Sequence, residues 1–90
     1  MPFSKKKGAL HMATHLLTTS KIKYLTTLLE LDPEAKGIRS IAVARQLNIS
    51  RPSVHTMIQK LADEGYVNKE YYGIIYLTPK GIETANKYSK

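Results

Sequence analysis

The chain has 90 residues, no cysteine and a formal net charge of +7 at pH 7. A chain of this length makes one small domain around a single core, and the lack of thiols excludes a disulfide framework or a thiolate metal site. No apolar run approaches the length of a bilayer span and no signal peptide follows the lysines at 5–7, so we expect a soluble, cytoplasmic protein with no membrane partner.

The positive charge is concentrated in two parts of the chain. Residues 1–23 contain five lysines and no acid, and residues 38–60 contribute +4. Lysines and arginines that neutralise phosphates release condensed counterions, so a polyanion is the natural partner for such a distribution. An ordinary soluble surface is the alternative, and charge alone does not decide between the two.

In chain order, residues 1–18 are expected to form a flexible basic arm and residues 19–90 the folded domain. The arm contains three lysines with proline, serine and glycine, and buries too little apolar surface to order itself. The first helix of the domain is predicted from Ser20, as N-cap, to Leu31. Pro33 ends it, because proline disfavours helical backbone at the residue before it.

A helix-turn-helix is predicted next. A strand of one or two residues at 37–40 precedes a short helix from Ile41 to Leu47, and residues 48–50 form the turn. The third helix covers residues 51–64, with Ser50 as N-cap and a proline in its first turn. Its apolar residues recur at helical spacing and predict a buried stripe of Val54, Met57, Ile58 and Leu61.

A hairpin and a last helix complete the predicted fold. Gly65 lets the third helix stop, and strands at 66–70 and 74–77 are joined around Tyr71-Tyr72-Gly73. Thr78 caps the last helix with Pro79 as its first residue. The fold class predicted from this order is α+β, a winged helix-turn-helix with a three-helix core, a β-hairpin wing and a C-terminal helix.

The residues from about Ser20 to Tyr88 resemble the N-terminal winged-helix domain of the metal-dependent (iron and manganese) repressor family. The resemblance implies a transcriptional regulator of repressor type that binds double-stranded DNA. It covers about three-quarters of the chain, and other winged-helix regulators share most of its signals. The matching motifs are Leu47-x-Ile49-Ser50-x-Pro52-Ser53-Val54, Met57-Ile58-Gln59-Lys60-Leu61-x-x-Glu64-Gly65-Tyr66-Val67, Tyr72-Gly73-Ile74 and Leu77-Thr78-Pro79-Lys80-Gly81.

The departures from that family concern metal. Its members continue into helices that supply most metal ligands and the dimer interface, and we expect this chain to lack that part. The family's ligand positions on the first helix correspond here to Lys23 and Thr26, which are poor metal ligands. His11, Met12 and His15 lack a carboxylate or thiolate partner, so we expect no metal site and no cofactor.

The predicted DNA contacts come from three parts of the chain. The N-terminal half of the third helix reads base edges with Pro52, Ser53, His55 and Thr56, and Arg51 contacts a guanine. Phosphates are expected to be held by the cap, by the helix further on and by the preceding helix. The full set of expected DNA-binding residues is Arg39, Arg45, Ser50, Arg51, Pro52, Ser53, His55, Thr56, Gln59, Lys60, Lys69, Tyr71 and Tyr72.

Other functions are weaker on this sequence. It contains no cysteine nucleophile, no phosphate-binding glycine-rich loop and no paired carboxylates at strand ends, so we expect no enzyme. A winged-helix module that binds protein or RNA is the alternative to DNA binding. Specificity usually needs two half-sites, which predicts a homodimer. Its interface is expected from Leu10–Leu31 and from the last helix with Ile82, Ala85 and Tyr88. The operator, the effector and the choice between activation and repression stay open.

Overall fold

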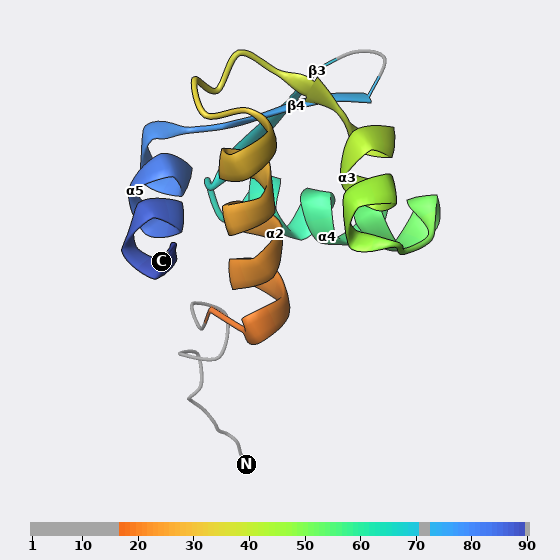
Figure 1. The fold of residues 1–90 in the computed structure, drawn as a ribbon, viewed down its shortest axis with the longest axis horizontal. Coiled ribbons are helices and arrows are strands. Elements are labelled where there is room, and N and C mark those ends of the chain that lie inside the picture. The colour runs from red at the N-terminus through yellow and green to blue at the C-terminus, as the bar shows by residue number, and fades with distance from the viewer. Residues whose placement is uncertain (1–16, 71–72, 90) are drawn as a thin grey trace.

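The structure is a computed structural model that describes residues 17–70 and 73–89. Within these residues, the helices α2 and α5 lie side by side, and a small sheet crosses one end of the helices (Figure 1). This architecture confirms the predicted α+β winged helix-turn-helix. In chain order the elements are α2 (Thr19–Leu31), β2 (Ile38–Arg39), α3 (Ser40–Leu47), α4 (Arg51–Asp63), β3 (Val67–Glu70), β4 (Ile74–Leu77) and α5 (Pro79–Tyr88).

The sheet is antiparallel, with strand order β2-β4-β3. Val67 pairs with Leu77 in the hairpin, and Ile38 pairs with Ile75 on the other edge of β4. The short strand β2 was predicted from the sequence and is confirmed. It ties the segment before α3 to the hairpin, so the wing and the helix-turn-helix are held in one sheet.

The core lies where the helices meet the inner face of this sheet. Val54, Ile58 and Leu61 of α4 are each at most 2% exposed, as the predicted stripe requires, whereas Met57 is only partly buried. Each such side chain contributes about 1.5–3 kcal/mol when it leaves water. The largest fully buried residues are Leu25, Leu28, Val43, Val54, Ile58, Leu61, Val67 and Ile75.

The helix starts differ from prediction at two places. Ser20 is not the N-cap of α2, because Thr18 has the extended backbone of a cap and its hydroxyl accepts from the Lys21 amide at 3.1 Å. Leu17 already packs against the core. The next helix, α3, begins at Ser40 instead of Ile41, directly after the strand pairing of β2 ends.

The ends of the next elements also shift slightly. Helix α4 ends at Asp63, with Glu64 as its C-cap, so the predicted range 51–64 is one residue too long. Strand β3 begins at Val67 instead of residue 66, because the Tyr66 amide is used in closing the helix and donates to the Leu61 carbonyl at 2.9 Å. None of the described helices is long and apolar enough to cross a membrane.

Two residues predicted for a dimer interface are used inside the chain. Leu28 and Ala85 are each 1% exposed, because α2 and α5 pack against one another. The prediction that they supply an interface is therefore wrong. Leu31 and Tyr88 remain on the surface at 38% and 47% exposure.

Candidate nucleic-acid interface

The turn of the helix-turn-helix is built by the end of α3. Asn48 takes the left-handed conformation (φ 57°, ψ 50°), which asparagine tolerates better than most residues. The Ile49 amide then donates to the Ala44 carbonyl at 3.0 Å, and the Asn48 amide donates to the Arg45 carbonyl at 3.3 Å. These bonds close α3 and set the direction in which α4 starts.

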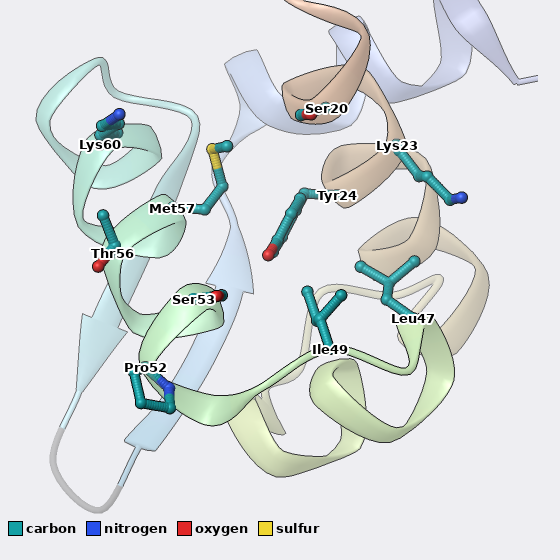
Figure 2. A pocket seen from close by; sticks show the side chains of 10 residues that line it. All are labelled: Ser20, Lys23, Tyr24, Leu47, Ile49, Pro52, Ser53, Thr56, Met57 and Lys60. Carbon is teal, nitrogen blue, oxygen red and sulfur yellow. The ribbon is translucent and has the colours of Figure 1, made fainter.

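The side of α4 that faces away from the core is open and polar. Figure 2 shows Pro52, Ser53, Thr56 and Lys60 following one another along this helix. All the α4 residues that the sequence predicted for base and phosphate contact are thus exposed on the side of the helix away from the core. The exposed residues of α4 are Arg51, Pro52, Ser53, His55, Thr56, Gln59, Lys60 and Asp63.

Ser50 caps α4 as predicted. Its hydroxyl oxygen accepts from the Ser53 amide at 3.3 Å and its hydroxyl donates to the Ser53 hydroxyl oxygen at 2.9 Å. The Ser53 hydroxyl keeps its own proton, which leaves it able to donate to a phosphate or to a base acceptor. Ser50 is already occupied by capping, so a phosphate at this helix end would compete with those bonds.

The wing is connected to α4 by a short polar chain. Lys69 on β3 donates to the Gln59 amide oxygen at 2.6 Å, and the Gln59 amide nitrogen donates to Asp63 at 3.1 Å. Gln59 is therefore engaged at both ends of its amide. Sequence reasoning placed Gln59 and Lys69 in the interface but missed their contact, because they belong to different elements.

A groove of about 300 Å³ runs between α4 and the hairpin. His55 and Lys69 line it together, above the apolar side chains Ile58 and Ile75. The predicted contacts from Tyr71 and Tyr72 lie outside the described residues. His55 of α4 and Lys69 of β3 thus border the same groove, together with the acidic Glu70.

Two further predicted contacts lie on and before α3. Arg39 ends β2 and Arg45 lies in the last turn of α3, and both side chains are exposed. Among the described residues, the ion pairs are Lys21 with Glu64 and Lys36 with Glu34. Both arginines are therefore outside those pairs and keep their charge open to solvent.

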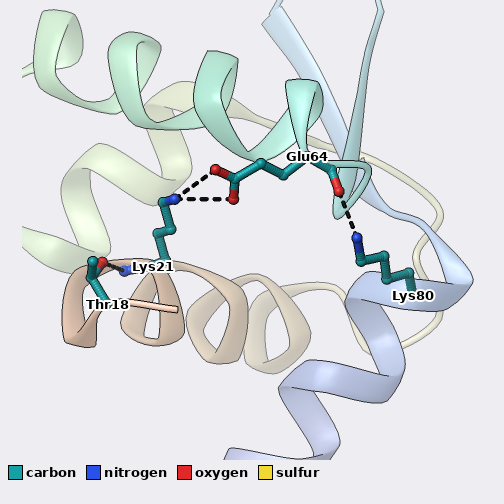
Figure 3. A network of polar contacts seen from close by, with 4 residues as sticks. All are labelled: Thr18, Lys21, Glu64 and Lys80. Carbon is teal, nitrogen blue, oxygen red and sulfur yellow. Dashed lines mark hydrogen bonds and ion pairs between the residues drawn. The ribbon is translucent and has the colours of Figure 1, made fainter. Parts of the chain in front are cut away.

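The C-terminal end of α4 is held by charged residues whose contacts the sequence analysis did not predict (Figure 3). Both oxygens of the Glu64 carboxylate accept from the Lys21 ammonium, at 3.0 and 2.7 Å. The Glu64 carbonyl accepts from the Lys80 ammonium at 2.8 Å, and that ammonium lies 4.5 Å from the centre of the Tyr66 ring. We call Lys21, Glu64, Tyr66, Lys80 and the adjoining Gly81 the junction, because they join α2, α4 and α5.

The positions where metal ligands would lie in the metal-dependent family carry no carboxylate here. Lys23 is exposed on α2, and the Thr26 hydroxyl donates to the Lys23 carbonyl at 3.1 Å. Within residues 17–70 and 73–89, no three histidine, cysteine or acidic side chains come together as a metal site. His11, Met12 and His15 lie outside the described residues.

Comparisons with known proteins agree on a family of DNA-binding transcriptional regulators. The model of the iron dependent repressor N-terminal DNA binding domain matches residues 16–74. A helix-turn-helix-type transcriptional regulator of Methanocaldococcus jannaschii is 48% identical over 52 residues, which are 58% of this chain and 42% of that protein.

Solved structures agree with the fold. The IdeR of T. acidophilum is similar with a TM-score of 0.69 and 28% identity, over 80% of this chain and 34% of its own. The transcriptional repressor CouR, bound to p-coumaroyl-CoA, is similar with a TM-score of 0.66 and 30% identity, over 87% of this chain and 55% of its own. The chain thus spans less than half of the M. jannaschii protein and about a third of IdeR.

Proposed function

The chain belongs to the iron dependent repressor family by its N-terminal DNA-binding domain, and on this premise we propose that it regulates transcription by placing α4 in the major groove of a specific duplex. The observation that carries this proposal is the division of α4 into two faces. Val54, Ile58 and Leu61 are buried, whereas the outer face is exposed, polar and basic. A helix with this division can enter a groove without losing core contacts.

The N-terminal half of α4 is proposed to read bases. The exposed Thr56 methyl and the Pro52 ring suit the methyl group of thymine, and the guanidinium of Arg51 suits a bidentate contact to guanine. His55 and the free proton of the Ser53 hydroxyl can donate to base acceptors. Pro52 and Thr56 lie towards the middle of the exposed side of α4, with Ser53 towards α2 and His55 towards the hairpin, so together they span the width of a groove-facing surface.

Phosphate contacts are proposed for the flanking residues. Lys60 lies further along α4, and Arg39 and Arg45 present exposed guanidinium groups before and within α3. Ser50 would exchange its capping bonds for one phosphate oxygen. Lys69, together with Tyr71 and Tyr72, is proposed to follow the backbone or the minor groove beside the hairpin.

We further propose that the protein acts as a homodimer in the cytoplasm of a bacterial or archaeal cell, without enzymatic activity. One recognition helix offers few base contacts, and two half-sites about one helical turn apart supply the missing specificity. After the burial of Leu28 and Ala85, the candidates for an interface among the described residues are the exposed Leu31 and Tyr88.

The decisive experiment selects preferred duplexes from random DNA and then compares variants on the selected site and on random DNA. Thr56→Ala and His55→Ala should each cost about 1–3 kcal/mol of binding free energy on the selected site and much less on random DNA. Lys60→Ala should weaken both alike, because a phosphate contact carries no sequence information. Two half-sites related by two-fold symmetry in the selected sequence would indicate that the protein binds as a dimer.

The alternative is a winged-helix module that binds protein or RNA through the same surface. Failure to recover any consensus would favour it. So would a consensus on which Lys60→Ala is selective while His55→Ala and Thr56→Ala are neutral on all DNA. The outer face of α4 argues against it, because its exposed side chains are basic and hydrogen-bonding and include no large apolar residue.

A further inference from the structure

A second feature of the α4 surface is a cavity of about 530 Å³ between α4, the turn of the motif and α2. Figure 2 shows Ile49 and Leu47 on one wall and Met57 on the other, with Tyr24 reaching in from α2. Lys23 and Lys60 lie at its rim on α2 and α4. The volume lies within the range of sites that hold small organic molecules.

Tyr24 supplies the most buried of the hydroxyls that line this cavity, which also include those of Ser20, Ser53 and Thr56. The residue is only 7% exposed, and its hydroxyl points into the space between the walls (Figure 2). Among the described residues the hydroxyl makes no hydrogen bond, and it faces the cavity instead of being enclosed, so water or a ligand can bond it. Burial raises the pKa of Tyr24, so the hydroxyl stays protonated and available as a donor.

The charge at the rim has one sign. Lys23 and Lys60 line the cavity and no acidic residue does. Neither lysine takes part in the ion pairs of the described residues. The Lys23 ammonium turns outward in Figure 2, and its flexible stem can bring it back over the opening. Apolar walls of Leu47, Ile49 and Met57, with hydroxyl donors and two lysines around them, suit an anion with an apolar body.

We propose that this cavity binds an amphipathic organic carboxylate, with its aromatic or aliphatic body between Ile49 and Met57 and its carboxylate bonded by the Tyr24 hydroxyl beneath the rim lysines. Thr56 and Lys60 border both this cavity and the proposed DNA surface. The ligand and the duplex therefore exclude one another, so the carboxylate acts as an inducer that releases DNA. This second step rests on the proposed function, whereas ligand binding itself does not.

The first test titrates the full chain, without DNA, with the aromatic carboxylate naphthoate and follows the backbone amide resonances by NMR. Saturable shifts should be confined to residues 20–24 and 47–60. The neutral analogue naphthamide should bind about tenfold more weakly, because it lacks the charge that the lysines attract. Equal binding of the two compounds, or shifts that do not saturate, would overturn the proposal.

Variants give the second test. Tyr24→Phe keeps the buried ring and removes only the hydroxyl, and it should weaken naphthoate binding by about tenfold. Tyr76→Phe is the matched control, because the Tyr76 hydroxyl bonds to Glu70 on the sheet and does not line the cavity, and it should leave binding unchanged. Unchanged binding by Tyr24→Phe would refute the assigned site even if naphthoate binds elsewhere.

Competition is measured separately with a labelled selected duplex. Naphthoate should displace the duplex from the natural chain and displace it less from Tyr24→Phe. If naphthoate binds at the cavity but the duplex is not displaced, the inducer role is wrong and the binding site stands. If the chain binds no duplex, the proposed function fails, and the NMR titration still decides the cavity.

Discussion

The charged residues at the two ends of α4 differ in whether they have partners within the chain. At the C-terminal end, Glu64 is bonded by Lys21 and Lys80, and all three groups have partners within the chain. In the N-terminal half, Arg51 and His55 are exposed and outside the ion pairs of the described residues. The same helix thus carries charge that holds the fold at one end and charge that is open to a partner at the other.

Burial accounts for this difference. The Lys21 side chain is 11% exposed and that of Glu64 is 26% exposed, so their attraction is less screened than that of a surface pair. Charges in the N-terminal half of α4 lie in water, where an isolated ion pair would be worth little. Such exposed charges contribute to binding when a polyanion contacts them, because the contact releases the counterions condensed on the polyanion.

Among the substitutions that test this comparison, Gly81→Ala at the junction is expected to have the largest effect on stability. A Cβ at Gly81 would lie 2.0 Å from the Tyr66 carbonyl oxygen and 3.0 Å from a Leu77 methyl group. We expect a loss of about 3 kcal/mol in the free energy of unfolding, because backbone atoms must move to make room. Denaturant unfolding measures this loss.

The control for Gly81→Ala is Glu83→Ala, an exposed position in the same helix. It should change the free energy of unfolding by less than about 0.5 kcal/mol. In an exposed helix interior, replacing glycine with alanine normally adds about 1 kcal/mol. A gain of stability in Gly81→Ala would therefore show that α5 does not approach Tyr66 as closely as described.

The second test breaks the ion pair of the junction. Glu64→Gln should lower the free energy of unfolding by about 2 kcal/mol, because the largely buried Lys21 ammonium loses its counter-charge. Lys21→Met should cost less, since the Glu64 carboxylate that it leaves without a counter-charge is more exposed than the Lys21 side chain and keeps more of its water. The same unfolding experiment applies, and base selectivity on DNA should be unchanged because the outer face of α4 is untouched.

The double variant Lys21→Met with Glu64→Gln separates pairing from other effects. If the two side chains interact as described, its loss should be smaller than the two single losses together. If the stability losses of the two single variants simply add in the double variant, the ion pair contributes no measurable interaction energy. The exposed pair Lys36 and Glu34 is the internal comparison, and Glu34→Gln should be nearly neutral.

These examples also show what the sequence can predict. The cap at Ser50, the stop at Gly65 and the Thr78-Pro79 start of α5 were predicted correctly, because each depends on residues within one helical turn. The buried stripe of α4 follows from its own periodicity. Most of the fold, and the exposed face proposed to contact DNA, could therefore be predicted.

The features that were missed join residues far apart in the chain. Lys21 and Glu64 are 43 positions apart, and no local pattern marks one as the partner of the other. Gly81 looks like an ordinary helix residue until the Tyr66 carbonyl is placed against it. Tyr24 has no sequence signal that its ring is buried with the hydroxyl in a cavity. Such contacts are set by packing between elements.

The third test concerns the hydrogen bond that connects α4 to the wing, between Gln59 and Lys69. Lys69→Ala removes both a proposed phosphate contact and the bond to Gln59. It should weaken binding similarly on all duplexes. The slope of the logarithm of the binding constant against the logarithm of salt concentration should fall in magnitude by about one. Gln59→Ala breaks the same link but keeps the lysine charge, so its salt dependence should stay unchanged. A sequence-selective loss in Lys69→Ala would mean that the wing reads bases.

The smallest expected effect is that of added metal. Exposed Lys23 and the Thr26 hydroxyl, which donates to the Lys23 carbonyl, occupy the α2 positions where metal-regulated relatives would carry ligands. An ammonium has no lone pair for a cation at neutral pH, and one hydroxyl is a poor substitute for a carboxylate. We therefore expect duplex affinity, measured by anisotropy, to change less than about twofold when manganese or iron is added. Tightening of about tenfold that a chelator reverses would contradict this, and it would place a metal site in residues 1–16, where His11 and His15 lie.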